Sequence, residues 1–129
     1  MPKKKDPEPV DEIDLEVDML KSKAFRSLSM GRIHIYFALK IKRREQYLKY
    51  KAKGKPSSIN YKHTEWSYKD AEKETGFSSA TFRRAIEGLQ EKGFIDVVKR
   101  GTGGSKNSTN IYQLSPRWKK YGTKNFVNK

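Results

Sequence analysis

Residues 78–91 carry two kinds of side chain at helical spacing, and one kind has the chemistry to contact nucleic acid. Apolar residues recur at i, i+3, i+4 and i+7, at positions Phe82, Ala85, Ile86 and Leu89. Between them lie hydroxyl and arginine side chains, and the candidate contacts to DNA are Ser78, Ser79, Thr81, Arg83 and Arg84. Arginine forms bidentate hydrogen bonds with guanine, and the positive end of a helix dipole favours phosphate. The pattern fits an ordinary surface helix equally well, so the neighbouring segments decide between the two readings.

A second set of basic and polar residues lies at the end of a predicted strand and in the loop after it. The candidate contacts here are Lys99, Arg100, Lys106 and Asn107. Glycines at positions 101, 103 and 104 let this loop follow a groove or the phosphate backbone closely. Contacts of this kind position a protein on DNA more than they select a sequence. The alternative is a plain hairpin loop made of the usual turn residues.

Residues for catalysis or metal binding do not form a recognisable set. The chain has no cysteine, and its two histidines, His34 and His63, have no second ligand at useful spacing. The glycine-rich stretch 101–108 lacks the Gly-Lys-Ser/Thr of a phosphate-binding loop, because Ser105 precedes Lys106. We therefore expect no enzyme activity, no cofactor and no metal site.

Net charge is the strongest signal of the composition. The 129 residues carry a formal charge of +14, and only 34% of them are hydrophobic. Residues 1–18 contain three lysines and seven acids, so the rest of the chain holds 26 basic and eight acidic side chains. A body this basic attracts polyanions, either nucleic acid or an anionic membrane surface. No apolar run approaches the roughly 20 residues that a membrane span needs, so we expect no membrane partner. The expected location is cytoplasmic, and nucleoid-associated when the protein is bound to DNA.

The N-terminal third of the chain divides into a tail, an arm and a long helix. Residues 1–12 are rich in proline and charge and are predicted to be disordered. Residues 13–19 alternate apolar and acidic side chains, which indicates an edge strand, an extended arm or an acidic tail. A first helix then follows from an N-cap at Ser29 and ends before Gly54. Its predicted core stripe is Ile33, Phe37 and Ile41, broadened by Ile35 and Leu39.

The second half of the chain predicts a helix, a turn and a helix, followed by a hairpin. Gly76 suits a tight turn, Phe77 fits between two helices, and Ser78 is a natural N-cap for the second one. A short strand is expected near residues 65–67, and two more at 94–100 and 110–115. This order predicts an α+β fold, a mainly helical winged helix-turn-helix with a C-terminal β-hairpin wing. The expected domain spans residues 13–115, followed by a basic, aromatic tail over 116–129.

Motifs spread between residues 19 and 115 resemble a known family. The matching residues are Ser22, Ala24, Phe25, Leu28 and Ser29 before the first helix; Ser67, Tyr68, Asp70, Ala71, Gly76, Phe77 and Ser78 around the turn; and Leu89, Gly93, Phe94, Ile95, Tyr112 and Leu114 toward the end. This pattern resembles the small winged helix-turn-helix domains of phage and plasmid replication proteins and of related transcription regulators. Glu72 and Thr75 depart from it, since small and aliphatic residues are usual there.

Charge, motifs and resemblance together favour binding of double-stranded DNA. The resemblance implies a replication-initiation or regulatory factor of a plasmid, phage or other mobile element. The alternatives are a transcriptional regulator of a chromosomal operon and a non-catalytic protein-interaction adaptor on the same fold. RNA binding through the tyrosines of residues 47–61 is a third possibility. The partners would be DNA and either a second copy of the chain or a replication or transcription protein, although the sequence shows no dimerisation heptad.

Overall fold

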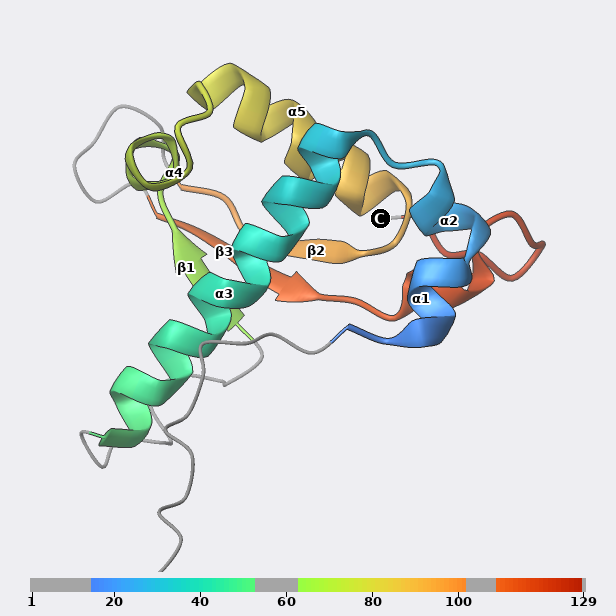
Figure 1. Ribbon diagram of the computed structural model, residues 1–129, viewed down its shortest axis with the longest axis horizontal. Coiled ribbons are helices and arrows are strands. Elements are labelled where there is room, and N and C mark those ends of the chain that lie inside the picture. The colour runs from blue at the N-terminus through green and yellow to red at the C-terminus, as the bar shows by residue number, and fades with distance from the viewer. Residues whose placement is uncertain (1–14, 53–62, 102–108, 129) are drawn as a thin grey trace, which may run out of the picture.

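Helices alternate with the strands of a small sheet in the computed structural model, which describes residues 15–52, 63–101 and 109–128 (Figure 1). The helices are α1 (Val17–Lys21), α2 (Lys23–Arg26), α3 (Met30–Ala52), α4 (Tyr68–Thr75) and α5 (Ser79–Glu91). The strands are β1 (His63–Trp66), β2 (Ile95–Lys99) and β3 (Asn110–Leu114), and a 3-10 helix, η1 (Arg117–Lys120), follows them. The predicted α+β class is confirmed. The tail expected to be disordered, residues 1–12, lies outside the described residues, as do Lys106 and Asn107.

The three strands form one antiparallel sheet in the order β1–β3–β2, so the last strand of the sequence lies in the middle. Thr64 pairs with Tyr112 across β1 and β3, and Ile95 pairs with Leu114 across β2 and β3. Alternate residues of β1 and β3 are buried, namely Thr64, Trp66, Asn110 and Tyr112. Because side chains alternate between the two faces of a strand, one face of the sheet is covered by the core.

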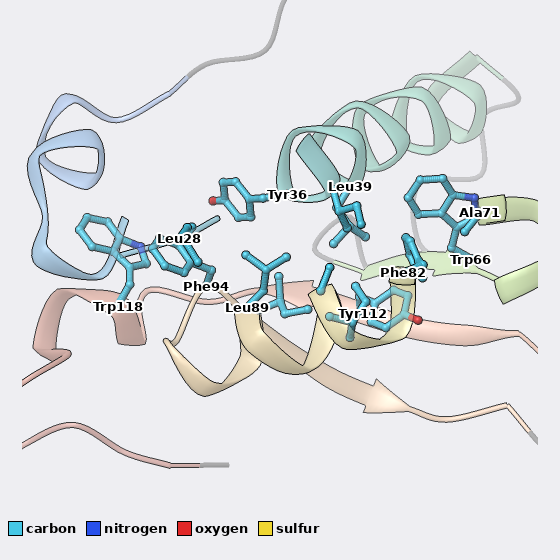
Figure 2. Close-up of a cluster of buried hydrophobic side chains, with 14 of the residues drawn as sticks. Leu28, Tyr36, Leu39, Trp66, Ala71, Phe82, Leu89, Phe94, Tyr112 and Trp118 are labelled. Atoms are coloured by element: carbon cyan, nitrogen blue, oxygen red, sulfur yellow. The ribbon is translucent and has the colours of Figure 1, made fainter. Parts of the chain in front are cut away.

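Phe82 of α5 lies at the centre of this core and has no exposed surface. Its ring makes edge-to-face contacts with Trp66 of β1, Tyr68 of α4 and Tyr112 of β3, at centroid distances of 5.3, 6.0 and 6.4 Å. Aromatic pairs favour this geometry. Figure 2 shows Phe82 close to Trp66 and Tyr112, with Leu89 further along α5. All four residues of the predicted α5 stripe are buried, so that prediction is confirmed.

Helix α3 begins where the sequence predicted, but it turns a different face to the core. The Ser29 hydroxyl accepts a hydrogen bond from the Arg32 amide at 3.3 Å, as an N-cap does. The predicted stripe is right only in part: Ile33 and Phe37 are half-buried against the core, and Ile41 is 46% exposed. The fully buried residues are Ile35, Tyr36 and Leu39. Apolar residues line two faces of this helix, and periodicity does not tell which face packs inward.

The segment before α3 forms two short helices, and the first of them, α1, overlaps the stretch 13–19 for which the sequence predicted a strand, an extended arm or a tail. Met19 is buried while Val17 is 61% exposed, so the alternation of apolar residues does not describe burial here. Ser22 separates the two helices. Its hydroxyl donates to the Met19 carbonyl at 2.6 Å and accepts from the Phe25 amide at 3.1 Å. These local hydrogen bonds favour helix over strand, because they satisfy backbone groups at both helix ends.

The C-terminal segment packs against the body through two adjacent side chains. Trp118 is buried and stacks on Phe94, with ring centroids 6.2 Å apart and planes 8° from parallel. Arg117 donates to the Asp96 carboxylate at 2.9 Å and to three backbone carbonyls, at Gln90, Ile95 and Val127. Its side chain is only 10% exposed. One guanidinium therefore ties the end of α5, strand β2 and the C-terminal segment together.

We predict that Arg117→Ala destabilises the fold by about 2 kcal/mol, since it removes a largely buried guanidinium together with its hydrogen bonds to Asp96 and to three backbone carbonyls. Urea unfolding measures this change. Lys120→Ala, an exposed change in the same 3-10 helix, is the control and should shift stability by less than about 0.5 kcal/mol. Equal midpoints for the two variants would contradict the proposed role of Arg117.

Candidate nucleic-acid interface

Three residues, 76–78, join α4 to α5, and both ends of this turn are fixed locally. Gly76 ends α4 in the left-handed conformation, with φ of 81°, and its amide donates to the Glu72 carbonyl at 2.9 Å. The Ser78 hydroxyl caps α5 by accepting from the Thr81 amide at 3.1 Å. Both features are as the sequence predicted. Phe77 between them contacts the ring of His34 in α3, with centroids 5.0 Å apart.

Glu74 fastens α4 to the rest of the body. One carboxylate oxygen lies 2.6 Å from Lys42 Nζ of α3, and the other accepts from Trp66 Nε1 of β1 at 2.7 Å. Burial opposes ionisation of this carboxyl, but the hydrogen bonds from Lys42 and Trp66 outweigh it and lower its pKa. Trp66 also contacts Phe82 of α5, so this one side chain of β1 packs against both α4 and α5.

Three of the predicted contacts on α5, namely Thr81, Arg83 and Arg84, are exposed to solvent. Arg83 Nε lies 3.9 Å from Glu87 Oε1, in an exposed i,i+4 pair. Such pairs contribute little and exchange easily for another anion. The two arginines lie on the first two turns of α5, on the side away from the buried stripe. The core therefore fixes the direction in which they project.

The hydroxyls of Ser78 and Ser79 are already engaged within the protein. Ser78 Oγ donates to Thr81 Oγ1 at 2.9 Å, and Ser79 Oγ donates to the Glu72 carboxylate at 2.9 Å. The backbone at these two serines is the N-terminus of α5. The first amides of a helix have no hydrogen-bond acceptor within the helix, so a ligand could accept from them. Glu72, one of the two departures from the family pattern, thus holds Ser79 in place. Sequence reasoning did not foresee this contact.

Lys99 and Arg100 lie at the end of β2 and are both exposed. The Gly101 amide, just after them, donates to the buried Asn110 side chain at 2.9 Å. This hydrogen bond joins the segment just after the end of β2 to the first residue of β3. Lys106 and Asn107, the other two residues predicted to contact DNA from this hairpin, belong to the part of the chain that is not described.

Arg32 and Lys92 add a basic rim that the sequence analysis missed. A Cβ atom at Gly88 would lie 2.3 Å from Arg32 Nε, so the guanidinium of α3 rests on α5 at this glycine. Lys92, after the last turn of α5, donates to the Ser27 carbonyl at 3.1 Å. Burial and the nearby Arg32 lower the pKa of Lys92. Gly88 was the signal for this contact in the sequence. Glycine in the interior of a helix costs about 1 kcal/mol relative to alanine, so its presence there suggests that another group occupies the space of a side chain.

Over 15–52, 63–101 and 109–128, no group of three His, Cys, Asp or Glu side chains is close enough to hold a metal ion. None of the helices in that part of the chain is long and apolar enough to span a bilayer.

No protein-family model matches this chain, and no curated protein or solved structure matches it significantly. What the chain does is therefore inferred from its own residues and their geometry.

We predict that Gly76→Ala destabilises the protein by about 1–2 kcal/mol, because a Cβ atom is disfavoured at a φ of 81°. Gly31→Ala is the matched control: this glycine lies in the first turn of α3 with open space around it. That change should leave stability unchanged or raise it slightly. Urea unfolding of both variants tests the pair, and a Gly76→Ala protein as stable as wild type would refute the turn geometry.

A second prediction concerns Glu74. Its folded-state pKa lies below the ordinary 4.5, so its ionised form contributes stability above that pH, and the contribution is lost as pH falls through the folded pKa. NMR titration of the side-chain carboxyl should give a value below 4.5 in the wild type. In Lys42→Met it should rise, because burial remains while one hydrogen bond is removed. An unchanged pKa in Lys42→Met would mean that Lys42 does not hold the carboxylate.

Proposed function

We propose that this chain binds double-stranded DNA as a winged helix-turn-helix protein. In this proposal α4 and α5 form the helix-turn-helix, α5 is the recognition helix, and the β2–β3 hairpin is the wing. The observation that carries the proposal is the orientation of α5, with Phe82 and Leu89 buried and Arg83 and Arg84 exposed on its outer side.

The order of the elements supports this proposal. A short strand precedes α4, a glycine turn joins α4 to α5, and a hairpin follows whose second strand pairs with the short one. That pairing holds the hairpin beside the two helices. A helix-turn-helix places the first residues of its second helix at the base edges of the major groove. The corresponding residues here are at the N-terminal end of α5.

The side chains available at that end suit base contacts. Arg83 and Arg84 can each make a bidentate contact with guanine O6 and N7. Thr81 is exposed and keeps its hydroxyl hydrogen for a further acceptor, since its Oγ1 accepts from Ser78. Binding would replace the weak Arg83–Glu87 pair with a stronger one.

Phosphate contacts would come from both flanks of α5. Arg32 and Lys92 lie toward its C-terminal end, and Lys99 and Arg100 lie on the hairpin. The amides of the first turn of α5 would add donors at the positive end of the helix dipole. Contacts of this kind give affinity without sequence preference and make binding sensitive to salt. They agree with the excess of basic residues after residue 18.

The biological role that we propose is replication initiation or regulation in a plasmid, phage or other mobile element. It rests on the motifs around Ser29, Gly76 and Tyr112 that resemble those of phage and plasmid replication proteins. A DNA site with an inverted repeat, found near a replication origin, would support this role over that of an adaptor.

We predict that Arg83→Ala and Arg84→Ala each lower the preference for a selected site over random DNA by about 1–3 kcal/mol. The site comes from in-vitro selection of duplexes at near-physiological salt, and binding is then measured for both duplexes over a range of salt concentrations. If the double variant discriminates as well as wild type, α5 does not read the sequence.

Two further variants separate base contacts from general charge. Arg100→Ala should weaken both duplexes about equally and reduce the salt dependence. Lys21→Ala, at an exposed lysine at the end of α1, removes the same charge from an element that the proposed interface does not include, and it should change neither affinity by more than about twofold.

A further inference from the structure

Helix α3 has a second apolar face, opposite the one that it buries. Met30, Ile41 and Leu48 are 80%, 46% and 43% exposed, and Phe37 lies between them, half-buried and packed in part against the core. At about 100° per residue these four side chains fall within roughly 40° of one another around the helix axis. Leu39, at the centre of the buried face, points to the other side. This outer stripe, defined as Met30, Phe37, Ile41 and Leu48, continues along almost the whole helix.

An open groove runs along part of the outer stripe. Its volume is about 650 Å³, and its lining includes Met30, Phe37 and Ile41 of the stripe, with His34 and Phe77 beside them. Phe77 forms the wall on the side of the turn, where its ring meets His34 edge-on. Contiguous apolar surface of this kind on a folded protein marks an interaction site more often than isolated exposed residues do.

The spacing of the outer stripe is symmetric about position 39. Met30 and Leu48 lie nine residues on either side of it, and Phe37 and Ile41 lie two residues on either side. An antiparallel copy of α3 would therefore place Leu48 of one chain on Met30 of the other, and Phe37 on Ile41. Contacts about a two-fold axis require this self-complementarity. The seven-residue steps from Met30 to Phe37 and from Ile41 to Leu48 also suit two helices packed at a shallow angle.

Polar groups on the flank of the stripe are self-complementary as well, because an imidazole can donate a hydrogen bond to a carboxylate. His34 and Glu45 lie on the same side of it, about 20° apart in projection along the helix axis. Position 34 lies five residues before the centre and position 45 six residues after it. In the antiparallel pair, Glu45 thus faces His34 of the second copy, and the contact occurs twice.

We propose that the outer stripe of α3 is a homodimer surface on which two copies of the chain pair antiparallel. The 23 residues of α3 extend about 35 Å, and Figure 1 shows that the C-terminal part of the helix projects beyond the sheet, where it is accessible to a partner. A single pair of helices makes a small interface compared with the roughly 800 Å² per partner of a standard one, so we expect a reversible dimer. The surface is separate from Arg83 and Arg84, so the pairing does not depend on DNA binding.

Sedimentation of the full chain over a wide range of concentrations tests the pairing without DNA. Wild type should pass from monomer to dimer, and Ile41→Glu and Met30→Glu should each weaken association by at least about tenfold, because each buries an unpaired charge twice. Val17→Glu, at an exposed aliphatic residue of α1, is the matched control and should associate like wild type. Circular dichroism and urea unfolding confirm that each variant is folded. A wild type that stays monomeric, or dimerisation that both stripe variants retain, overturns the proposal.

Charge reversal tests the partner and the register together. His34→Glu should weaken the dimer about fivefold through repulsion from Glu45 of the second copy, and Glu45→Lys should weaken it by a similar factor. The double variant His34→Glu/Glu45→Lys should recover most of the wild-type affinity, since a carboxylate and an ammonium group then face each other. If the double variant is as weak as the two effects combined, the helices do not meet in this register and the proposal fails.

Discussion

The fold depends on the burial of one side chain, the ring of Phe82. This ring leaves α5 and meets Trp66, Tyr68 and Tyr112, which come from β1, α4 and β3. Four elements are thereby joined at one point. Phe94 has a similar place further along the core, where its ring meets Phe25 of α2, Tyr36 of α3 and Trp118 of η1. The contacts of Phe82 help to set the orientation of the small sheet relative to α4 and α5.

The burial of Phe82 fixes the rotation of α5 about its own axis, and that rotation determines which side chains of α5 face solvent. A helix held by a narrow apolar stripe turns its remaining positions to solvent in set directions, so Arg83 and Arg84 both project away from the core, about 100° apart around the helix axis. The left-handed Gly76 and the cap at Ser78 set where that helix begins. The hydroxyls of Ser78 and Ser79 already donate hydrogen bonds within the protein, to Thr81 and to Glu72. The exposed guanidinium groups are therefore the side chains of α5 best placed to contact a partner.

Helix α3 connects the two proposed functions, because one of its faces packs under α5 and the opposite face is the proposed dimer surface. Ile35, Tyr36 and Leu39 complete the core under α5, and Arg32 at its start rests on Gly88 beside the exposed side of α5. The opposite face carries Met30 and Ile41, which the fold of a single chain leaves largely exposed. A protein with this arrangement could bind DNA through one helix and a second copy of itself through another, with the core between them.

The sequence by itself determined the elements with strong local signals. The stripe of α5, the turn at Gly76, the cap at Ser78 and the hairpin strands follow from periodicity, left-handed glycine and side-chain hydrogen bonds, all of which act within a few residues. Tertiary structure decided the rest. Apolar residues on two faces of α3 made its inward side ambiguous, and only packing against α5 and β1 selected Ile35 and Leu39. Contacts across the chain, such as Arg117 with Asp96 and Arg32 with Gly88, join residues far apart in sequence, and neither spacing nor composition encodes such pairs.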